Sequence, residues 1–296
     1  MKTFFSLTAR NIKLFFKDKG MFFVSLITPV ILLVLYATFL GNVYRSSFTE
    51  NLPEALSVSE KLINGTVAGQ LLSSLLAVTP ITVSFCSNMR MVQDKMNGAR
   101  KDMQITPVKK PLLAFSYFLG TLATTLIVCY VATIAGLVYV AATGWFLSVS
   151  DVTLVLLDVF LLSLFGTALS SLVNMFLSTQ GQSSAVGTIV SSGYGFVCGA
   201  YMPISQFSTS LQNVLMFLPG TYGTSLIRNH ALNGVYQEML NINFPAEVVE
   251  GIKDSIDCNI YFFDSKVEIW VMYLVLLASI IALVSVYTLV SLLRKK

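Results

Sequence analysis

The sequence predicts an all-α polytopic membrane protein with six transmembrane helices, and two observations carry this prediction. Hydrophobic residues make up 55% of the 296 residues and charged residues 11%, whereas a soluble domain carries about 25% charge. Six apolar stretches separate the charged regions, and each is long enough to cross a hydrocarbon core of ~30 Å as a helix, which takes ~20 residues. They lie at about 21–41, 67–89, 112–142, 152–177, 184–203 and 267–293.

The distribution of charge predicts the orientation of these spans. With the N-terminus inside, fourteen of the nineteen lysines and arginines fall on the inner side, in residues 2–19, 90–110 and 294–296. The positive-inside rule therefore predicts a multi-pass protein of the cell membrane with both termini in the cytoplasm. Acidic residues gather outside, which indicates either a cationic or amphiphilic substrate or simply a solvated outer face. The net charge of +4 reflects the inside bias, and no nucleic-acid partner is expected.

The first elements are an interfacial helix and an uncleaved span. Within residues 1–20, the helical period of apolar side chains at 3–19, with basic side chains opposite, predicts an amphipathic helix on the anionic inner leaflet. The alternative is the positive flank of the first span. A signal peptide is disfavoured because the basic lead is long and no small-residue cleavage pattern follows Tyr36–Gly41.

The connections between spans are predicted to differ in length and charge. A polar outer loop is expected at 42–66 and a basic cytoplasmic loop at 90–111, followed by a third span long enough to require tilt or projection beyond the bilayer. Gly144 and Trp145 indicate an outer turn. The Ser178–Gln182 turn is predicted to be cytoplasmic, because an even number of predicted spans separates it from the cytoplasmic N-terminus.

Residues 204–226 are moderately apolar but interrupted by Pro219–Gly220 and preceded by Pro203. A full crossing here would place the C-terminal basic residues outside, so a re-entrant hairpin between spans five and six is predicted. Such a hairpin is tolerated only where protein or water satisfies its backbone. An extracellular segment at 227–266 follows, and residues 1–296 form one transmembrane domain.

The sequence lacks the common signatures of an enzyme. No glycine precedes a lysine, so there is no Walker A phosphate loop and no ATP bound in that manner. The single histidine, His230, is placed on the outer side, which excludes a multi-histidine metal centre in the membrane. No catalytic residue, metal or cofactor is expected on this chain.

Asp158 is the one ionisable side chain deep in a predicted span, roughly 10 Å below the outer start of its helix. A residue of this kind suggests a function by default. The alternative is that it stays protonated or bonds a hydroxyl group of a neighbouring helix, since no basic residue lies in any predicted span.

Two groups of residues near the fifth span are candidates for packing and for a substrate pathway. Small residues recur every four positions at Gly187, Ser191, Gly195 and Gly199, which predicts close approach of another helix of this chain or of a second protomer. Aromatic and hydroxyl side chains could line a path for an amphiphile, although packing and interface belts also explain them. These pathway candidates are Tyr194, Tyr201, Thr221 and Tyr222, together with Asp158.

Three stretches resemble the ABC-2 family of ATP-binding-cassette exporter permeases. In residues 97–113, a glycine, a charged short segment and Thr106-Pro107 resemble the family's coupling helix before span three. Residues 199–204 and 217–228 are similar to its end of span five, re-entrant helices and trailing arginine, and residues 10–19 to its amphipathic entry helix. The family often has an acidic pair near the start of the coupling helix, whereas here Arg100-Lys101 precede a lone Asp102.

The resemblance implies export powered by separate subunits. Two ABC ATPase subunits would bind ATP and magnesium, and a second permease copy or a paralogue would complete the pathway in a bacterial membrane. The ATPases would push on the coupling residues, which are Asn97, Gly98, Ala99, Arg100, Lys101, Asp102, Thr106 and Pro107. The substrate would be a hydrophobic or amphiphilic drug, peptide, lipid or lipid-linked glycan.

Two other classes of function stay open. An ion-coupled secondary transporter or channel would use Asp158, and a sensor or assembly subunit would use the same helices to bind partners without transport.

Overall fold

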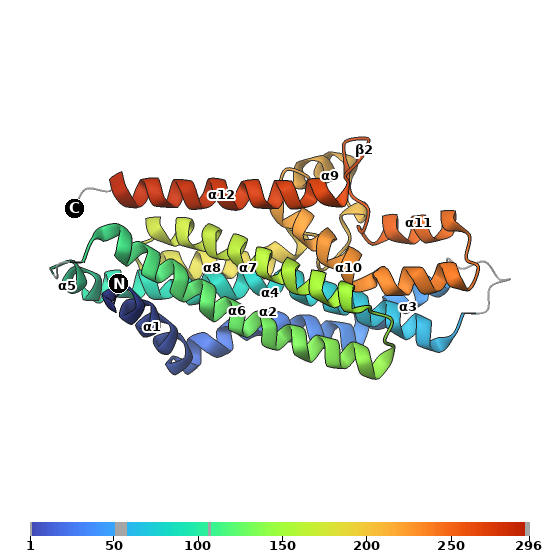
Figure 1. Ribbon diagram of the computed structural model, residues 1–296, viewed down its shortest axis with the longest axis horizontal. Coiled ribbons are helices and arrows are strands. Elements are labelled where there is room, and N and C mark those ends of the chain that lie inside the picture. Colours follow the sequence, from blue (N-terminus) through green and yellow to red (C-terminus); the bar gives the residue numbers. More distant parts are fainter. Residues whose placement is uncertain (1, 51–57, 106–107, 294–296) are drawn as a thin grey trace.

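The computed structural model describes residues 2–50, 58–105 and 108–293, and in it the helices run along one long axis (Figure 1). The helices are α1 (Lys2–Lys17), α2 (Lys19–Leu35), a π-helical turn (Tyr36–Leu40), α3 (Gly41–Glu50), α4 (Glu60–Met96), α5 (Ala99–Ile105), α6 (Lys110–Thr143), α7 (Val149–Phe176), α8 (Gln180–Val197), a 3-10 turn (Ile204–Gln206), α9 (Thr209–Leu215), α10 (Pro219–Asn241), α11 (Ala246–Ser255) and α12 (Ile269–Leu293). Strands β1 (Tyr261–Phe262) and β2 (Ser265–Lys266) form an antiparallel hairpin.

Five helical segments of the described residues are long and apolar enough to cross a membrane. They are Lys19–Ser46, Glu60–Met96, Lys110–Thr143, Val149–Phe176 and Ile269–Leu293. Each covers most or all of a predicted span, and α6, with 34 residues, has the extra length expected of the third one. An all-helical, multi-pass membrane fold follows from these segments.

The fifth predicted span, 184–203, corresponds to α8, which is shorter and more polar than the others. Glutamine, serine, threonine and glycine are frequent along its 18 residues, so it is not among the five apolar segments. The helix ends early because Gly199 adopts a left-handed conformation with φ 77°, which favours glycine. The sixth crossing therefore stays a prediction.

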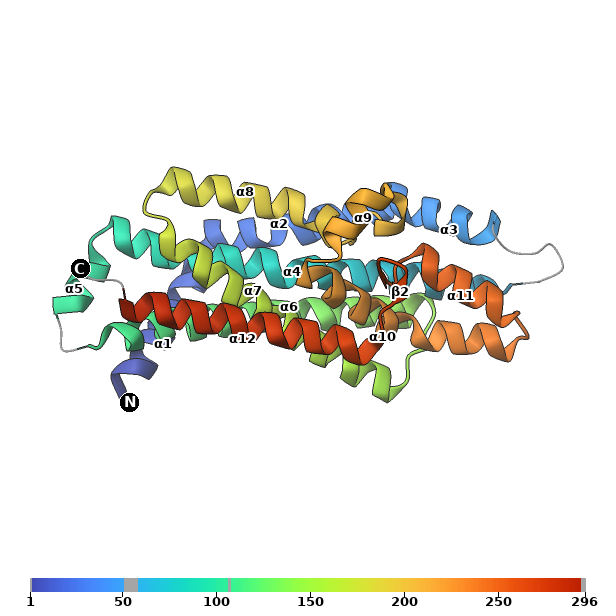
Figure 2. The same ribbon diagram turned by 90° about the horizontal axis from the view of Figure 1, so that it is seen from above.

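Helix α4 is the centre of the bundle. It contacts α2, α6, α7, α8 and α10, and its membrane-spanning part is almost entirely buried. Figure 2 shows α2 and α8 on one side of it and α12 on the other. Gly166 lets α7 approach α4 closely, because a Cβ atom at this position would lie only 3.0 Å from the Pro80 carbonyl oxygen of α4. Small residues at such contacts allow helices to pack tightly in a membrane.

One expected loop is helical, and one expected boundary, which stays a prediction, falls inside a continuous helix. The polar outer loop predicted at 42–66 is largely helical, because α3 continues the first span to Glu50 and α4 begins at Glu60, where Ser59 caps the helix. The boundary drawn between residues 226 and 227 falls inside α10, which is continuous from Pro219 to Asn241. A hydrophobicity pattern could not show either continuation, because protein contacts support these polar helices.

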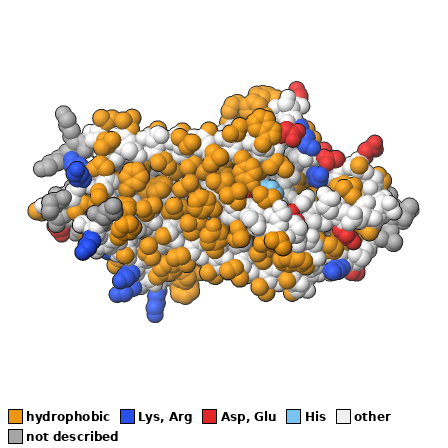
Figure 3. All heavy atoms as spheres, viewed as in Figure 1, with side chains coloured by type: hydrophobic (Ala, Val, Ile, Leu, Met, Phe, Trp, Pro, Cys, Tyr) orange, Lys and Arg blue, Asp and Glu red, His pale blue; other side chains and the backbone are white. Residues whose placement is uncertain are grey.

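The two ends of the bundle differ in charge. Both termini lie at one end, here called the terminal end, together with α5, whereas α3 and α11 lie at the opposite end (Figure 1). Hydrophobic side chains cover the middle of the surface, lysine and arginine gather at the terminal end, and acidic side chains concentrate at the opposite end (Figure 3). This pattern is the one expected of a protein that crosses a membrane with both termini inside.

Candidate functional site

At the terminal end, a sharp turn separates α5 from α4. Asn97 ends α4, and Gly98 follows with φ 79°, a conformation that a side chain would strain. The Gly98 carbonyl oxygen then accepts hydrogen bonds from the backbone N–H groups of Lys101 (2.8 Å) and Asp102 (3.1 Å), which starts the short helix. The sequence-predicted coupling residues 97–102 therefore form this turn and the first half of α5. Thr106 and Pro107 lie outside the described residues.

The outward face of α5 presents both charge and apolar surface. Lys101 and Asp102 are exposed, and the Ile105 side chain is 84% exposed. Single exposed apolar side chains are common on protein surfaces, so Ile105 is of interest only because it shares this short helix with the exposed charged residues. Sequence reasoning missed Ile105, because a single isoleucine beside Thr106-Pro107 carries no recognisable pattern.

One turn before α5, a buried carboxylate joins three helices. Asp94 of α4 accepts two hydrogen bonds from Arg10 of α1, at 2.7 and 3.1 Å, and one from the Tyr117 hydroxyl of α6, at 2.7 Å. Its side chain is only 5% exposed. The paired geometry is the bidentate form that makes arginine–carboxylate pairs strong and directional. Asn11 adds a bond to the Ser116 carbonyl oxygen at 3.2 Å, so α1 is fixed against both α4 and α6.

Two further cations tie the same end of α4 to its neighbours. The Lys95 ammonium group donates to the carbonyl oxygens of Asn174, Met175 and Leu177, at 2.7–2.8 Å, and so caps the C-terminus of α7. A cation is favourable there because unpaired carbonyl groups concentrate negative charge. Arg90 bonds the carbonyl oxygen of Leu14 at 3.3 Å in α1. Together with Asp94, these contacts connect α4 to α1, α6 and α7 immediately before the turn into α5.

The second polar centre lies inside the bundle, between α7, α10 and α12. Asp158 is fully buried, and its Oδ2 lies 2.6 Å from His230 Nδ1. Its other carboxylate oxygen accepts a hydrogen bond from the Tyr273 hydroxyl at 2.7 Å, and the rings of Tyr273 and His230 stack at 6.3 Å. Asp158 therefore has two partners from two different helices.

This arrangement corrects the expectation that Asp158 has no basic neighbour. His230 was placed in an outer segment, but α10 brings it beside the buried part of α7. The two residues are 72 positions apart, and only the packing of α10 into the bundle determines that they meet. The single histidine of the chain and one aspartate deep in a predicted span are the only sequence signal for such a pair.

A buried arginine fixes the connection after α8. Arg228 has no exposed surface, and it donates hydrogen bonds to the carbonyl oxygens of Gly199 (2.5 Å) and Ile256 (2.7 Å). It also lies 3.4 Å from Asp257. Asp257 in turn accepts hydrogen bonds from the backbone N–H groups of Ile204 and Ser205. The arginine thus satisfies backbone groups of a break in helical structure, as membrane depth requires.

The four aromatic and hydroxyl pathway candidates have mainly structural contacts. Thr221 and Tyr222 donate to the carbonyl oxygens of Leu215 and Met216, at 3.0 and 2.7 Å, and so close the joint between α9 and α10. Tyr194 and Tyr201 pack against α4 beside Ala77 and Val78. The hydrogen-bond partners of Asp158 are His230 and Tyr273 rather than any of these four residues. The structure therefore does not bring the five pathway candidates together into one site.

The small-residue stripe of α8 also has several separate roles. Gly195 is covered by the Tyr201 ring of its own connection, and a Cβ atom at Gly187 would meet nothing within 4 Å. Gly199 ends the helix, and the Ser191 carbonyl oxygen accepts a hydrogen bond from Thr28 of α2 at 3.4 Å. Within the described chain, Gly187 has no close helix beside it, so its predicted packing role requires a second protomer.

Glu250 connects α11 to the hairpin at the opposite end. It accepts hydrogen bonds from Lys253 (2.9 Å), Asn259 (2.9 Å) and Lys266 (3.1 Å), and these bonds lower its pKa from 4.5 to about 2. A carboxylate with a lowered folded-state pKa stabilises the fold above its unfolded pKa. That stabilisation is lost as the pH falls from about 4.5 towards 2.

We therefore expect amide hydrogen exchange of α11 and the hairpin to accelerate as the pH is lowered through this window, after correction for intrinsic exchange rates. Glu250→Gln should remove most of that pH dependence, because the amide does not titrate. The same dependence in the variant would assign it to other carboxylates.

Comparison with known families identifies one match. The family model described as ABC-2 type transporter matches residues 2–231, which include both polar centres up to His230. No curated protein matches the chain.

Proposed function

The chain belongs to the ABC-2 type transporter family, and from this premise we propose that it is the membrane permease subunit of an ABC exporter. Separate ATPase subunits would bind ATP and magnesium, and their motion would reach this chain through α5. The observation that carries the proposal is the attachment of α5 to the Asp94 network. The excess of lysine and arginine supports a cytoplasmic position for this end, where an ATPase could reach it.

The contacts around α5 support a mechanical route into the membrane. A displacement of α5 acts directly on α4, because only Asn97 and Gly98 separate the two helices. Arg10, Tyr117 and Lys95 link this end of α4 to α1, α6 and α7. Since α4 also contacts α2, α8 and α10, its movement would change the packing of most of the bundle. ATP-bound and ATP-free partners can bias this movement only by binding the two conformations with different affinity.

The segment between α8 and α12 supports the re-entrant arrangement. His230 of α10 bonds Asp158 well inside α7, so the first half of α10 lies at the depth of a membrane span. Its second half runs to the opposite end, where α11 also lies (Figure 1). Thr221 and Tyr222 satisfy carbonyl groups of the backbone break before Pro219, and Arg228 satisfies the Gly199 carbonyl group after α8. We infer that α9 and the start of α10 enter the outer leaflet and return.

A second protomer completes the proposed pathway. Helix α8 is largely exposed and carries serine, threonine and glycine side chains, which are costly to place against lipid when a protein surface is possible. A second copy of this chain or a paralogue would cover it. The substrate would be hydrophobic or amphiphilic. The Asp158–His230 contact keeps an ion-coupled transporter as the second candidate function, because ionisable pairs inside a membrane protein can relay protons.

Docking of an ATPase on α5 is tested by co-purification. Lys101→Glu combined with Ile105→Glu is expected to abolish a stable complex between this chain and its genomically adjacent ATPase, because it reverses one charge and adds another in an apolar contact. The matched control, Lys61→Glu with Val149→Glu, places the same changes on exposed residues at the opposite end and should leave the complex intact. An ATPase that binds both variants equally well would contradict docking at α5.

A further inference from the structure

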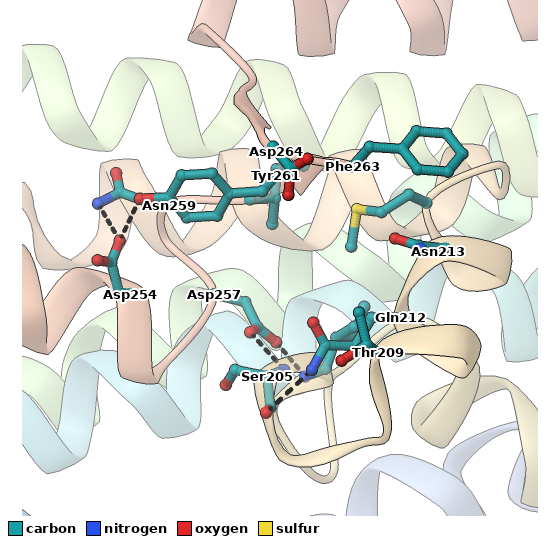
Figure 4. A pocket seen from close by; sticks show the side chains of 13 residues that line it. Ser205, Thr209, Gln212, Asn213, Asp254, Asp257, Asn259, Tyr261, Phe263 and Asp264 are labelled. Carbon is teal, nitrogen blue, oxygen red and sulfur yellow. Dashed lines mark hydrogen bonds between the residues drawn. The ribbon is translucent and has the colours of Figure 1, made fainter.

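A cavity of about 350 Å³ lies between α9 and residues 254–264 (Figure 4), near the start of α12 (Figure 1). This volume falls within the range of about 300–1,000 Å³ that is common for small-molecule sites. Its deepest lining is apolar, with Ile204, Met216 and Ile260 all at most 4% exposed. The connection after α8, the end of α9 and the segment before β1 supply these three side chains.

Carboxylates dominate the charge of the lining. Asp254, Asp257 and Asp264 line the cavity, and no lysine or arginine does. The negative charge of Asp257 is compensated by Arg228, whose guanidinium group lies 3.4 Å away. Asp254 accepts hydrogen bonds only from neutral donors, Asn259 at 2.7 Å and Tyr261 at 3.0 Å. Within the described part of the chain, no hydrogen bond or ion pair reaches Asp264, and no lysine or arginine forms an ion pair with Asp254, although Lys266 lies close enough to interact with it electrostatically.

The nearby lysines are held elsewhere. Lys253 and Lys266 both form ion pairs with Glu250, at 2.9 and 3.1 Å, and Lys253 also lies over the Tyr236 ring. Neither lysine lines the cavity. The local charge therefore favours a positively charged ligand.

An exposed aromatic cluster continues the lining towards the membrane. Phe217, Phe262 and Phe263 meet edge to face, with ring centroids 5.0–6.5 Å apart. Phe217 is 65% and Phe263 is 55% exposed, and Trp270 at the start of α12 is also exposed. Aromatic residues at the end of a span mark the membrane interface. The same rings offer apolar contact to a hydrocarbon chain and cation–π contact to an ammonium group.

We propose that this cavity binds the ammonium group of an amphiphile, with its apolar chain on the aromatic cluster formed by Phe217, Phe262 and Phe263. Asp254 and Asp264 compensate the positive charge, while Ile204, Met216 and Ile260 contact the alkyl substituents. This goes beyond the proposed permease function, which assigns no ligand to this cavity. Two sources share the required chemistry: a lipid with an ammonium headgroup and a free cationic amphiphile.

The test measures binding of labelled dodecyltrimethylammonium to the full chain without ATPase. The chain is placed in nanodiscs of a neutral galactolipid, and partitioning into empty nanodiscs is subtracted. Asp254→Asn with Asp264→Asn is expected to weaken binding about tenfold. The matched control, Glu238→Gln with Glu247→Gln, removes two outer carboxylates that do not line the cavity and should leave the affinity unchanged. Unlabelled dodecyl sulfate should not compete.

Equal weakening by the two double variants would overturn the proposal, because it would show diffuse attraction to the acidic face. Equally effective competition by dodecyl sulfate would overturn it as well, since binding would then be only apolar. Asn213→Trp supplies an independent check: it fills the cavity from its partly exposed rim and should abolish saturable binding. Full affinity in this variant would place the ligand elsewhere.

A second pair of conditions identifies the source of the ammonium group. If phosphatidylethanolamine added to the nanodiscs weakens probe binding to the wild type, a lipid headgroup occupies the cavity in the membrane. If it does not, the cavity selects free amphiphiles. Since no ATPase is present, failure of this test is independent of any failure of α5 to dock.

Discussion

Replacing Asp158 by leucine is expected to destabilise the folded protein by about 2–6 kcal/mol, because each of two buried polar groups left without its partner costs about 1–3 kcal/mol. The change leaves the His230 ring and the Tyr273 hydroxyl buried without their shared acceptor. It also releases α10 and α12 from α7 at the same point. Denaturant unfolding in detergent, followed by circular dichroism, would measure the loss.

Two further variants distinguish the loss of hydrogen bonds from the change in side-chain volume as the cause of this destabilisation. Asp158→Asn keeps an oxygen acceptor for Tyr273 and a polar partner for His230, so it should cost clearly less than leucine. Combining Asp158→Leu with His230→Leu removes both buried polar groups and should recover part of the loss, because an apolar pair of similar volume can replace a buried ion pair. An additive loss in the double variant would show that the two residues are not energetically coupled.

The same residue distinguishes the two candidate functions. If the Asp158–His230 pair only holds helices together, Asp158→Asn leaves any substrate flux and its pH dependence largely unchanged. In an ion-coupled transporter, the variant would abolish the effect of a proton gradient. Flux measured in vesicles with and without that gradient therefore decides between a structural and a proton-carrying role.

Removing the charge of Asp94 is expected to uncouple α1 from α4 without preventing assembly with the ATPase. Asp94→Asn weakens two charge-assisted hydrogen bonds from Arg10 and one from Tyr117, and bonds to charged groups contribute about 1.5–3 kcal/mol each. The exposed face of α5 is unchanged, so co-purification should persist. Movement of α5 would then no longer be passed fully to α1.

Spin labels at Lys13 of α1 and Ser178 after α7 report this coupling, since both side chains are exposed and the native cysteines are buried. We expect a narrow distance distribution in the wild-type complex and a broad one in Asp94→Asn. Tyr117→Phe removes a single neutral donor and should give an intermediate width. Unchanged distributions in both variants would show that other contacts, such as the packing of α1 on α6, hold the helix in place.

Most spans could be predicted from the sequence because the length and hydrophobicity of a segment are local properties. The predicted spans 67–89 and 112–142 lie within long apolar helices, 152–177 and 267–293 extend beyond two more by at most two residues, and the first span lies within Lys19–Ser46. The short charged helix after Gly98 was located through the resemblance of residues 97–113 to the family's coupling helix. Helix α4 shows the limit of this reasoning. It continues well beyond its predicted span at both ends, and hydropathy does not mark these extensions because they carry polar residues whose helical structure is supported by contacts with other helices.

The sequence by itself determined the class of protein, its expected orientation and the position of α5, since these depend on composition, charge and order along the chain. Only the tertiary structure decided that Asp158 meets His230 and Tyr273, that Asp94 joins Arg10 to Tyr117, and that carboxylates and phenylalanines surround one cavity. The physical reason is that each contact depends on the rotation and depth of helices that are distant in sequence. Packing sets these quantities, and hydrophobic periodicity does not encode them.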